Sequence, residues 1–305
     1  MPFCVSPVYY GPDMGKIILY YKFVPIVDPD MTMRWQRELC ERLELKGRII
    51  ISAHGINGTL GGDMEHVKAY VRAMNVTKQF KRITYKWSAG EKDHFPKLSI
   101  KVRDELVAFK AADELVVDEQ GVRNGGIHLK PKQLHELIEK RGDEVIFFDG
   151  RNTYEAQVGR FKGAIIPNVK TTPDFMKELD NPKYDAIKER PIVTYCTGGV
   201  RCEILSVLMK NRGFKEVYQI DGGIVKYGEK YGDDGLWEGS LYVFDSRMNH
   251  RFSANSVDIG ECVHCGAKTS NFINCADVSC NRLVLACETC APIHNLCENH
   301  TGVAV

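Results

Sequence analysis

The chain has 305 residues, of which 44% are hydrophobic and 27% are charged, and its formal net charge is +1. This composition is that of an ordinary folded protein of two or three domains, and it excludes a polycation. No apolar run approaches the length of a membrane span, and residues 1–16 lack a signal-peptide pattern, so we expect a cytoplasmic protein without a membrane partner. Eleven cysteines in that compartment favour metal or thiol chemistry over structural disulfides.

After a short N-terminal arm (residues 1–15), the chain alternates apolar strands with amphipathic helices. Apolar runs at 16–24, 47–52, 58–60 and 80–87 predict four strands, and helical spacing predicts two helices at 28–45 and 63–74. This β-α-β-β-α-β order is that of a ferredoxin-like sandwich, which we place at residues 16–110. The fold alone does not distinguish a docking domain from a binding domain.

The last part of this domain is strongly basic. From residue 78 to residue 103 there are eight basic residues, and only Glu91 and Asp93 oppose them. Basic side chains position phosphates, and the aromatic rings interleaved here are of the kind that stack on unpaired bases. The segment is therefore either an RNA-binding surface or a solvated strand face. The candidate RNA contacts are Lys78, Lys81, Arg82, Lys86, Lys97, Lys101 and Arg103.

A linker at 111–125 leads to a second domain at 126–240, whose most informative stretch is residues 191–209. An apolar run at 192–195 predicts a buried parallel strand, and the apolar residues after 202 recur at helical spacing. Cys196 follows the strand, and Arg201 precedes the helix. The loop that joins them consists of Thr197, Gly198, Gly199 and Val200.

A loop of this kind can point successive backbone N–H groups at the sulfur of Cys196, as an anion nest. The N-terminus of the following helix adds partial positive charge, and Arg201 adds a full charge. These features favour the thiolate, which is the nucleophilic form of cysteine. Cys196 is therefore the candidate catalytic residue. Cys202, at the start of the helix, either packs against the strand or resolves an oxidised or persulfidated Cys196 as a disulfide.

The loop resembles the active-site loop of rhodaneses, which are sulfurtransferases that carry a persulfide on cysteine. The resemblance continues at Asp149 and Arg151, at 161–165 and at 221–224, whereas Ile204 stands where relatives often have lysine. A loop of the protein-tyrosine-phosphatase type would place about five residues between cysteine and arginine, and the loop here is one residue shorter. The resemblance implies a rhodanese α/β domain with a parallel sheet.

Residues 241–305 form a cysteine-rich tail with little apolar material, in which eight candidate metal ligands fall in four pairs. Their spacing resembles that of zinc ribbons and knuckles, and structural zinc would supply folding energy that so small a core lacks. The pairs form two sites either in chain order or interleaved, with His264 and His294 as further candidates; the alternative is a tail of reduced thiols. The pairs are Cys262 and Cys265, Cys275 and Cys280, Cys287 and Cys290, and Cys297 and His300.

The combination of GINGTL at 55–60, CTGGVRCE at 196–203 and a cysteine-rich tail is similar to the rhodanese-domain tRNA uridine hydroxylases. The resemblance implies oxygen-dependent formation of 5-hydroxyuridine at the wobble position of tRNA, with Cys196 as the matching catalytic cysteine and molecular oxygen as co-substrate. Sulfur transfer from thiosulfate or a persulfide donor, and a scaffold built on an inactive rhodanese domain, remain open. The sequence shows no flavin or nicotinamide fingerprint.

Overall fold

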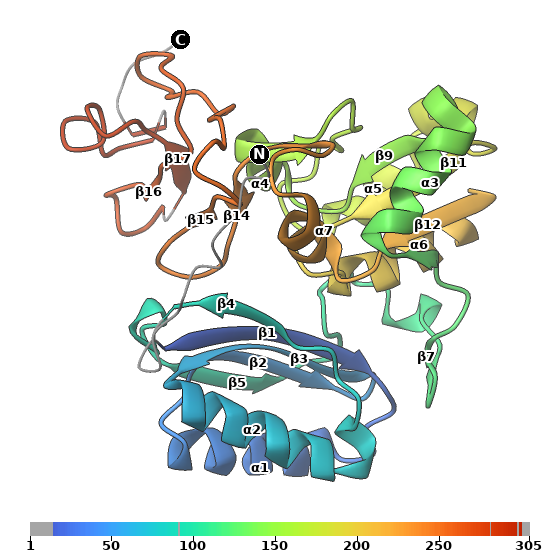
Figure 1. Ribbon diagram of the computed structural model, residues 1–305, viewed down its shortest axis with the longest axis vertical. Coiled ribbons are helices and arrows are strands. Elements are labelled where there is room, and N and C mark those ends of the chain that lie inside the picture. The colour runs from blue at the N-terminus through green and yellow to red at the C-terminus, as the bar shows by residue number, and fades with distance from the viewer. Residues whose placement is uncertain (1–14, 91, 281, 298, 301–305) are drawn as a thin grey trace, which may run out of the picture. The chain divides into compact units, whose positions relative to one another are not determined.

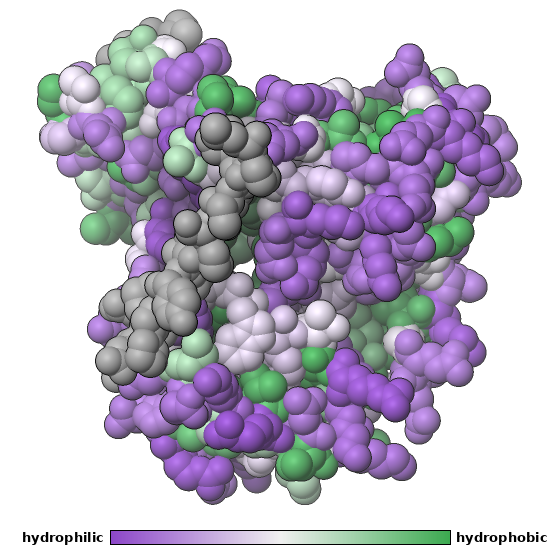
Figure 2. Space-filling model, viewed as in Figure 1, coloured by the Kyte–Doolittle hydropathy of each residue, from purple (hydrophilic) through white to green (hydrophobic). Residues whose placement is uncertain are grey.

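The computed structural model describes residues 15–90, 92–280, 282–297 and 299–300. The chain divides into two compact units: Met1–Leu106 with Val117–Gly121, and Val107–Val116 with Val122–Val305 (Figure 1). Of the expected N-terminal arm, residues 1–14 lie outside the described part. None of the described helices is long and apolar enough to span a membrane, and hydrophilic side chains cover most of the face shown in Figure 2.

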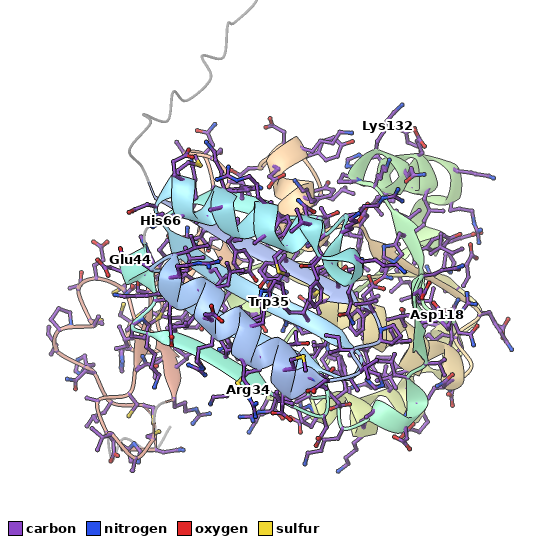
Figure 3. All side chains as sticks on the ribbon, turned by 90° about the horizontal axis from the view of Figure 1, so that it is seen from below. Arg34, Trp35, Glu44, His66, Asp118 and Lys132 are labelled. Carbon is purple, nitrogen blue, oxygen red and sulfur yellow. The ribbon has the colours of Figure 1, made fainter. Side chains whose placement is uncertain are left out.

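The first unit is a five-stranded sheet with two helices on one of its faces. Figure 3 shows the two helices lying side by side over the sheet. The elements in chain order are β1 (Lys16–Phe23), α1 (Pro29–Arg42), β2 (Lys46–Ser52), β3 (Gly55–Gly62), α2 (Met64–Val76), β4 (Lys86–Ala89) and β5 (Leu98–Val102). The strand order is β4-β1-β3-β2-β5, with β5 parallel to β2 and the other neighbours antiparallel. The predicted ferredoxin-like sandwich is therefore confirmed, and β5 is an additional edge strand.

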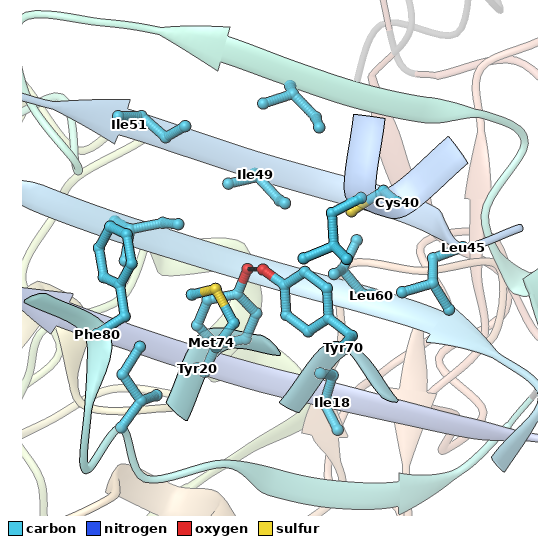
Figure 4. Close-up of a cluster of buried hydrophobic side chains, with 14 of the residues drawn as sticks. Ile18, Tyr20, Cys40, Leu45, Ile49, Ile51, Leu60, Tyr70, Met74 and Phe80 are labelled. Atoms are coloured by element: carbon cyan, nitrogen blue, oxygen red, sulfur yellow. Dashed lines mark hydrogen bonds between the residues drawn. The ribbon is translucent and has the colours of Figure 1, made fainter. Parts of the chain in front are cut away.

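The core of this unit lies between the sheet and its helices, and it contains a buried polar pair. The hydroxyl groups of Tyr20 and Tyr70 are hydrogen-bonded at its centre (Figure 4), and Tyr70 also donates to Gln36 Oε1 at 2.5 Å. A Cβ at Gly58 would lie 2.5 Å from the Tyr20 phenol. Glycine at this position therefore lets the ring of Tyr20 approach the backbone of β3 closely, which gives part of the GINGTL motif a packing role.

The predicted strand at 80–87 is wrong over most of its length. Phe80 ends a short 3-10 helix, η1 (Lys78–Phe80), and Arg82 has a φ of 62°, which lies outside the β region. The strand begins only at Lys86. Phe80 is apolar because it packs into the core, where its ring stacks on Trp35 with a centroid distance of 5.8 Å.

The second unit is built on a four-stranded sheet of order β8-β12-β11-β9, in which every neighbouring pair is parallel. This arrangement confirms the expected rhodanese α/β domain. Its elements are β8 (Ile127–Leu129), α3 (Pro131–Arg141), β9 (Ile146–Asp149), α4 (Thr153–Val158), β10 (Gly159–Phe161), α5 (Asp174–Leu179), β11 (Pro191–Tyr195), α6 (Val200–Asn211), β12 (Glu216–Ile220), α7 (Gly223–Tyr231) and β13 (Trp237–Gly239).

Short elements complete the chain. The residues expected to form a linker at 111–125 contain η3 (Ala112–Glu114) and the strand pair β6 (Val117–Asp118) and β7 (Gly121–Val122). The cysteine-rich region holds two antiparallel pairs, β14 (Leu241–Tyr242) with β15 (Asn249–His250), and β16 (Phe272–Asn274) with β17 (Leu283–Leu285). The remaining 3-10 helices are η2 (Lys92–His94), η4 (Gly142–Glu144) and η5 (Pro182–Ile187).

Candidate active site

Cys196 lies at the carboxyl end of β11, in the loop that turns directly into α6. Gly199 has a φ of 100°, a left-handed conformation that glycine adopts without strain, and it caps the helix. This turn directs the Gly199 N–H at the sulfur of Cys196, with a distance of 3.1 Å between N and Sγ. Cys196 itself is buried, with 1% of its surface exposed. The loop therefore encloses the sulfur and offers it backbone donors.

Backbone N–H groups at the start of α7 donate hydrogen bonds to carbonyl groups of this loop. The N–H of Ile224 donates to the carbonyl of Cys196 at 2.9 Å, and the N–H of Val225 donates to that of Thr197 at 3.1 Å. Gly223 has a φ of 68°, and a Cβ there would lie 2.4 Å from the Cys196 carbonyl oxygen. α7 therefore fixes the loop through its carbonyls, on the strand side of the Gly199 amide that donates to the sulfur.

Arg201 is fixed by a buried carboxylate that the sequence analysis did not connect with it. Its Nη1 and Nη2 donate to Glu155 Oε1 and Oε2 at 2.5 and 2.8 Å, and Nη2 also reaches Thr197 Oγ1 at 3.3 Å. Glu155 is fully buried. Glu155 also accepts a hydrogen bond from the backbone N–H of Asn152 at 3.1 Å, which is a helix-capping contact that the sequence pattern indicates. The sequence pattern does not indicate that Glu155 pairs with Arg201.

These surroundings determine the protonation of the two cysteines. Burial alone would raise the pKa of Cys196, but hydrogen bonds from the Cys202 side chain and from the Cys202 and Gly199 amides, together with the charge of Arg201, lower its pKa to about 5. Burial and the hydrogen bond to Cys196 raise the pKa of Cys202 well above its usual value. The opposite shifts in pKa favour a thiolate at Cys196 and a thiol at Cys202.

Cys202 is fully buried on α6, and its sulfur lies 3.8 Å from Thr194 Oγ1. A buried, protonated thiol is a weak attacking group, because thiol exchange proceeds through the thiolate. Cys202 therefore acts on Cys196 as a protonated neighbour that lowers the pKa of the Cys196 thiol. Its role as a resolving thiol stays a prediction.

Asp149 and Arg151, which carry part of the rhodanese resemblance, form a fully buried ion pair. The Nε and Nη2 atoms of Arg151 donate to the two carboxylate oxygens at 2.9 and 2.6 Å, and Nη2 also donates to the carbonyl of Gly159 at 2.7 Å. Its guanidinium carbon lies 5.2 Å from the ring centre of Trp237. This pair joins β9, β10 and β13, so its contacts are structural.

The structure divides the candidate RNA contacts between opposite edges of the first unit's sheet, because β4 and β5 are its two edge strands. One group precedes β4 and the other lies on or beside β5, so the basic segment does not form a single continuous stripe. All six of these side chains are exposed. The first group is Lys78, Lys81 and Arg82, and the second is Lys97, Lys101 and Arg103.

The prediction that Lys86 contacts RNA together with these residues is wrong. It is only 4% exposed, and its ammonium group lies 4.9 Å from the ring centre of Tyr21 on the neighbouring strand. A side chain buried against an aromatic ring is not placed to bind a phosphate. The sequence could not show this, because Lys86 begins a strand and its direction depends on the register with β1.

The group before β4 includes a lysine from a distant part of the sequence. Lys22 Nζ donates to the carbonyl of Lys81 at 2.8 Å, and burial together with the charge of Arg82 lowers the pKa of Lys22. We refer to Lys22, Lys81 and Arg82 as the basic cluster. Lys22 thus lies beside the chain segment that carries the exposed side chains of Lys81 and Arg82, and positive charge of this kind favours an anionic ligand.

The eight paired residues of the tail come together in two clusters, and the pairs are interleaved. The first and third pairs form one cluster and the second and fourth form the other, with the ligand atoms in each within 4.8 Å of one another. Cys265 and Cys287, from different pairs, have their sulfur atoms 3.7 Å apart. The rings of His264 and His294 stack on each other at 4.9 Å and belong to neither cluster. The clusters are Cys262, Cys265, Cys287 and Cys290, and Cys275, Cys280, Cys297 and His300.

Three family models match the chain: a UPF0176 acylphosphatase like domain at residues 15–106, a rhodanese-like domain at 130–230 and a rhodanase C-terminal domain at 238–300. The chain is 61% identical over 276 residues to a tRNA uridine(34) hydroxylase of Corynebacterium jeikeium, a match that covers 90% of this chain and 89% of that protein. Proteins of the same name from Corynebacterium aurimucosum and Corynebacterium diphtheriae are 58% and 60% identical, and each match covers at least 90% of both chains.

Proposed function

Because the chain belongs to the family of tRNA uridine(34) hydroxylases, we propose that it converts uridine 34 of tRNA to 5-hydroxyuridine with molecular oxygen and the Cys196 thiolate. The observation that carries this proposal is the loop around Cys196, whose Gly199 amide donates to the sulfur and whose surroundings lower the pKa of the thiol. The names of the relatives favour hydroxylation over simple sulfur transfer, which is the alternative. A tRNA substrate also implies a cytoplasmic protein.

Each loop residue has a distinct part in this proposal. Cys196 supplies the reactive sulfur, and the Gly199 amide and the Cys202 thiol stabilise its negative charge. Arg201 adds positive charge, while Glu155 holds the guanidinium in place. Molecular oxygen supplies the hydroxyl oxygen atom, and its second atom leaves as water with two electrons and two protons from an external reductant. The chain's own residues hold the sulfur, its charge and the surrounding loop.

The test is nucleoside mass spectrometry of total tRNA from cells that lack the gene and carry a plasmid-borne variant. We expect 5-hydroxyuridine with the wild type, and none with Cys196→Ser, which exchanges the sulfur for oxygen at nearly constant volume. Cys40→Ala is the matched control, because Cys40 is a buried thiol in the core of the first unit. Growth under ¹⁸O₂ should label the new hydroxyl group. Unchanged 5-hydroxyuridine with Cys196→Ser would contradict the proposal.

For the tail, we propose that each cluster holds a structural zinc ion. Tetrahedral zinc with Zn–S bonds of about 2.3 Å and Zn–N bonds of about 2.0 Å places two sulfurs roughly 3.8 Å apart, and a sulfur and a nitrogen roughly 3.5 Å apart. The structure has sulfur pairs at 3.7 and 3.6 Å. In the second cluster, His300 Nδ1 lies 3.3 and 3.5 Å from the sulfurs of Cys275 and Cys297. Four protein ligands leave no open position, so these ions would stabilise the fold.

We further propose that the basic cluster binds tRNA phosphates. The support is the position of Lys22, which donates to the Lys81 carbonyl and whose pKa is lowered by burial and by the charge of Arg82. Phosphate contacts of this kind position an RNA without reading its sequence. Lys97, Lys101 and Arg103, at the other edge of the sheet, are exposed and remain candidate contacts for a second stretch of RNA backbone.

A further inference from the structure

An exposed aromatic ring lies beside the active-site arginine. Phe244 is 54% exposed, and it is the most exposed phenylalanine or tryptophan among the described residues. The guanidinium carbon of Arg201 lies 5.7 Å from the centre of its ring. Because Arg201 is bonded to Glu155 and to Thr197 of the cysteine loop, the ring of Phe244 borders this loop.

Other aromatic side chains pack against the ring of Phe244 and hold it in position. Tyr242 packs edge-on against Phe244, with ring centres 5.1 Å apart and planes at 85°, and Tyr242 is itself packed against Tyr154 and Phe272. The turn that carries Phe244 is closed by a hydrogen bond from the Val243 N–H to the carbonyl of Met248 at 3.1 Å. A ring ordered before binding loses little conformational entropy when a ligand stacks on it.

We propose that Phe244 is the stacking platform for the target base: it stacks on the uracil of nucleotide 34 and holds it at the entrance to the Cys196 loop. This inference rests on the proposed function. Enzymes that modify a base act on an unpaired nucleotide or extrude the base from its stack, and aromatic side chains supply stacking contacts to the base. Phe244 offers a flat apolar surface, a fixed orientation and a location next to the reactive centre, and these are the features that such a platform needs.

The Phe244→Leu and Phe244→Trp variants test the platform with an anticodon stem-loop RNA as substrate. Leucine keeps the apolar character and loses the ring, whereas tryptophan keeps a stacking surface. We expect kcat/KM to fall at least about 5-fold in Phe244→Leu and to stay near the wild-type value in Phe244→Trp, because stacking of a base on an aromatic ring contributes about that much or more. Val257→Ala, which removes another exposed apolar side chain, is the control.

Two further measurements separate stacking from a disturbed loop. The midpoint of Cys196 ionisation should be the same in Phe244→Leu as in the wild type, because the hydrogen bonds to the sulfur are unchanged. In Phe244→Trp, tryptophan fluorescence should be quenched by RNA that carries uridine at position 34, and much less by the same RNA with an abasic site there. The wild-type protein with each RNA gives the contribution of the native tryptophans.

The outcomes distinguish this inference from the function on which it rests. If the wild type forms no 5-hydroxyuridine in RNA, the proposed function fails. If the wild type is active but Phe244→Leu retains the wild-type kcat/KM, or if abasic RNA quenches Phe244→Trp equally, the stacking platform is wrong and the proposed function stands.

Discussion

Replacing Cys202 tests how the charge on Cys196 is stabilised. The buried Cys202 thiol is a principal donor to the Cys196 sulfur, together with two backbone amides and the charge of Arg201. Cys202→Ala removes this donor and leaves the others. Cys202→Ser keeps a donor of similar size and is the matched control.

The expected change in pKa follows from the energy of one hydrogen bond. A hydrogen bond to a charged group contributes about 1.5–3 kcal/mol, and one pKa unit corresponds to about 1.36 kcal/mol. Because S–H is a weak donor, the lower value applies, which gives a shift of about one unit. The pKa of Cys196, lowered to about 5 in the wild type, should therefore rise toward about 6 in Cys202→Ala and stay near its original value in Cys202→Ser.

The assay is the ultraviolet absorbance of the thiolate, titrated against pH and taken as the difference between each variant and the same variant carrying Cys196→Ser. The difference cancels the thiolates of the tail. A midpoint that does not move in Cys202→Ala would refute the proposed stabilisation of Cys196 by the Cys202 thiol.

The same variants test the role of Cys202 as a resolving thiol. At pH 7 the Cys196 thiolate predominates even after a shift of one unit, so a hydrogen-bond donor is nearly dispensable for activity under these conditions. A resolving thiol is indispensable, because neither alanine nor serine can form a disulfide. Loss of 5-hydroxyuridine formation in both variants at pH 7 would therefore assign Cys202 a redox role, and retention in both would exclude it.

Two further predictions concern the tail and the basic cluster. The double variant Cys265→Ser with Cys287→Ser should lose one zinc ion per chain and keep the other, because the interleaved arrangement puts both residues in one cluster. Elemental analysis measures the zinc content. Loss of both ions would indicate that the pairs form their sites in chain order. Lys81→Ala combined with Arg82→Asn should weaken tRNA binding and flatten its salt dependence by about 0.7 per lost phosphate contact, relative to Lys132→Ala. Asparagine is chosen because it tolerates the positive φ of Arg82. An unchanged salt dependence of tRNA binding would show that the basic cluster is an ordinary solvated surface.

Features set by neighbouring residues could be predicted from the sequence. The order of strand, cysteine, loop, arginine and helix at 191–209 lies within one stretch of chain, and the structure has β11, the loop and α6 in that order. Glu155 could not be connected with Arg201 in this way, because 46 positions separate them and only the folded chain brings them together. The same holds for Lys22 beside Lys81, and for the ring of Phe244 beside Arg201.

The wrong fourth strand has a different cause. Phe80 and Ile83 are buried, as residues of a strand would be, but they reach the core from a 3-10 helix and the turn after it. An apolar pattern shows which side chains are buried and does not distinguish these backbone paths over so short a segment. The additional strand β5 was not predicted, because the basic residues around it indicated a solvent-exposed segment and not a strand.

The interleaving of the two clusters has a consequence for how the tail is made. The first cluster requires Cys290 and the second requires His300, while Cys275 and Cys280 lie on the chain segment that the first cluster closes into a loop. During synthesis the ligand set of the first cluster is therefore complete before that of the second. A proteolytic cut between Cys280 and Cys287 would divide both clusters at once. One cut in this segment should consequently release both metal ions, whereas a cut between Cys265 and Cys275 would divide only the first cluster.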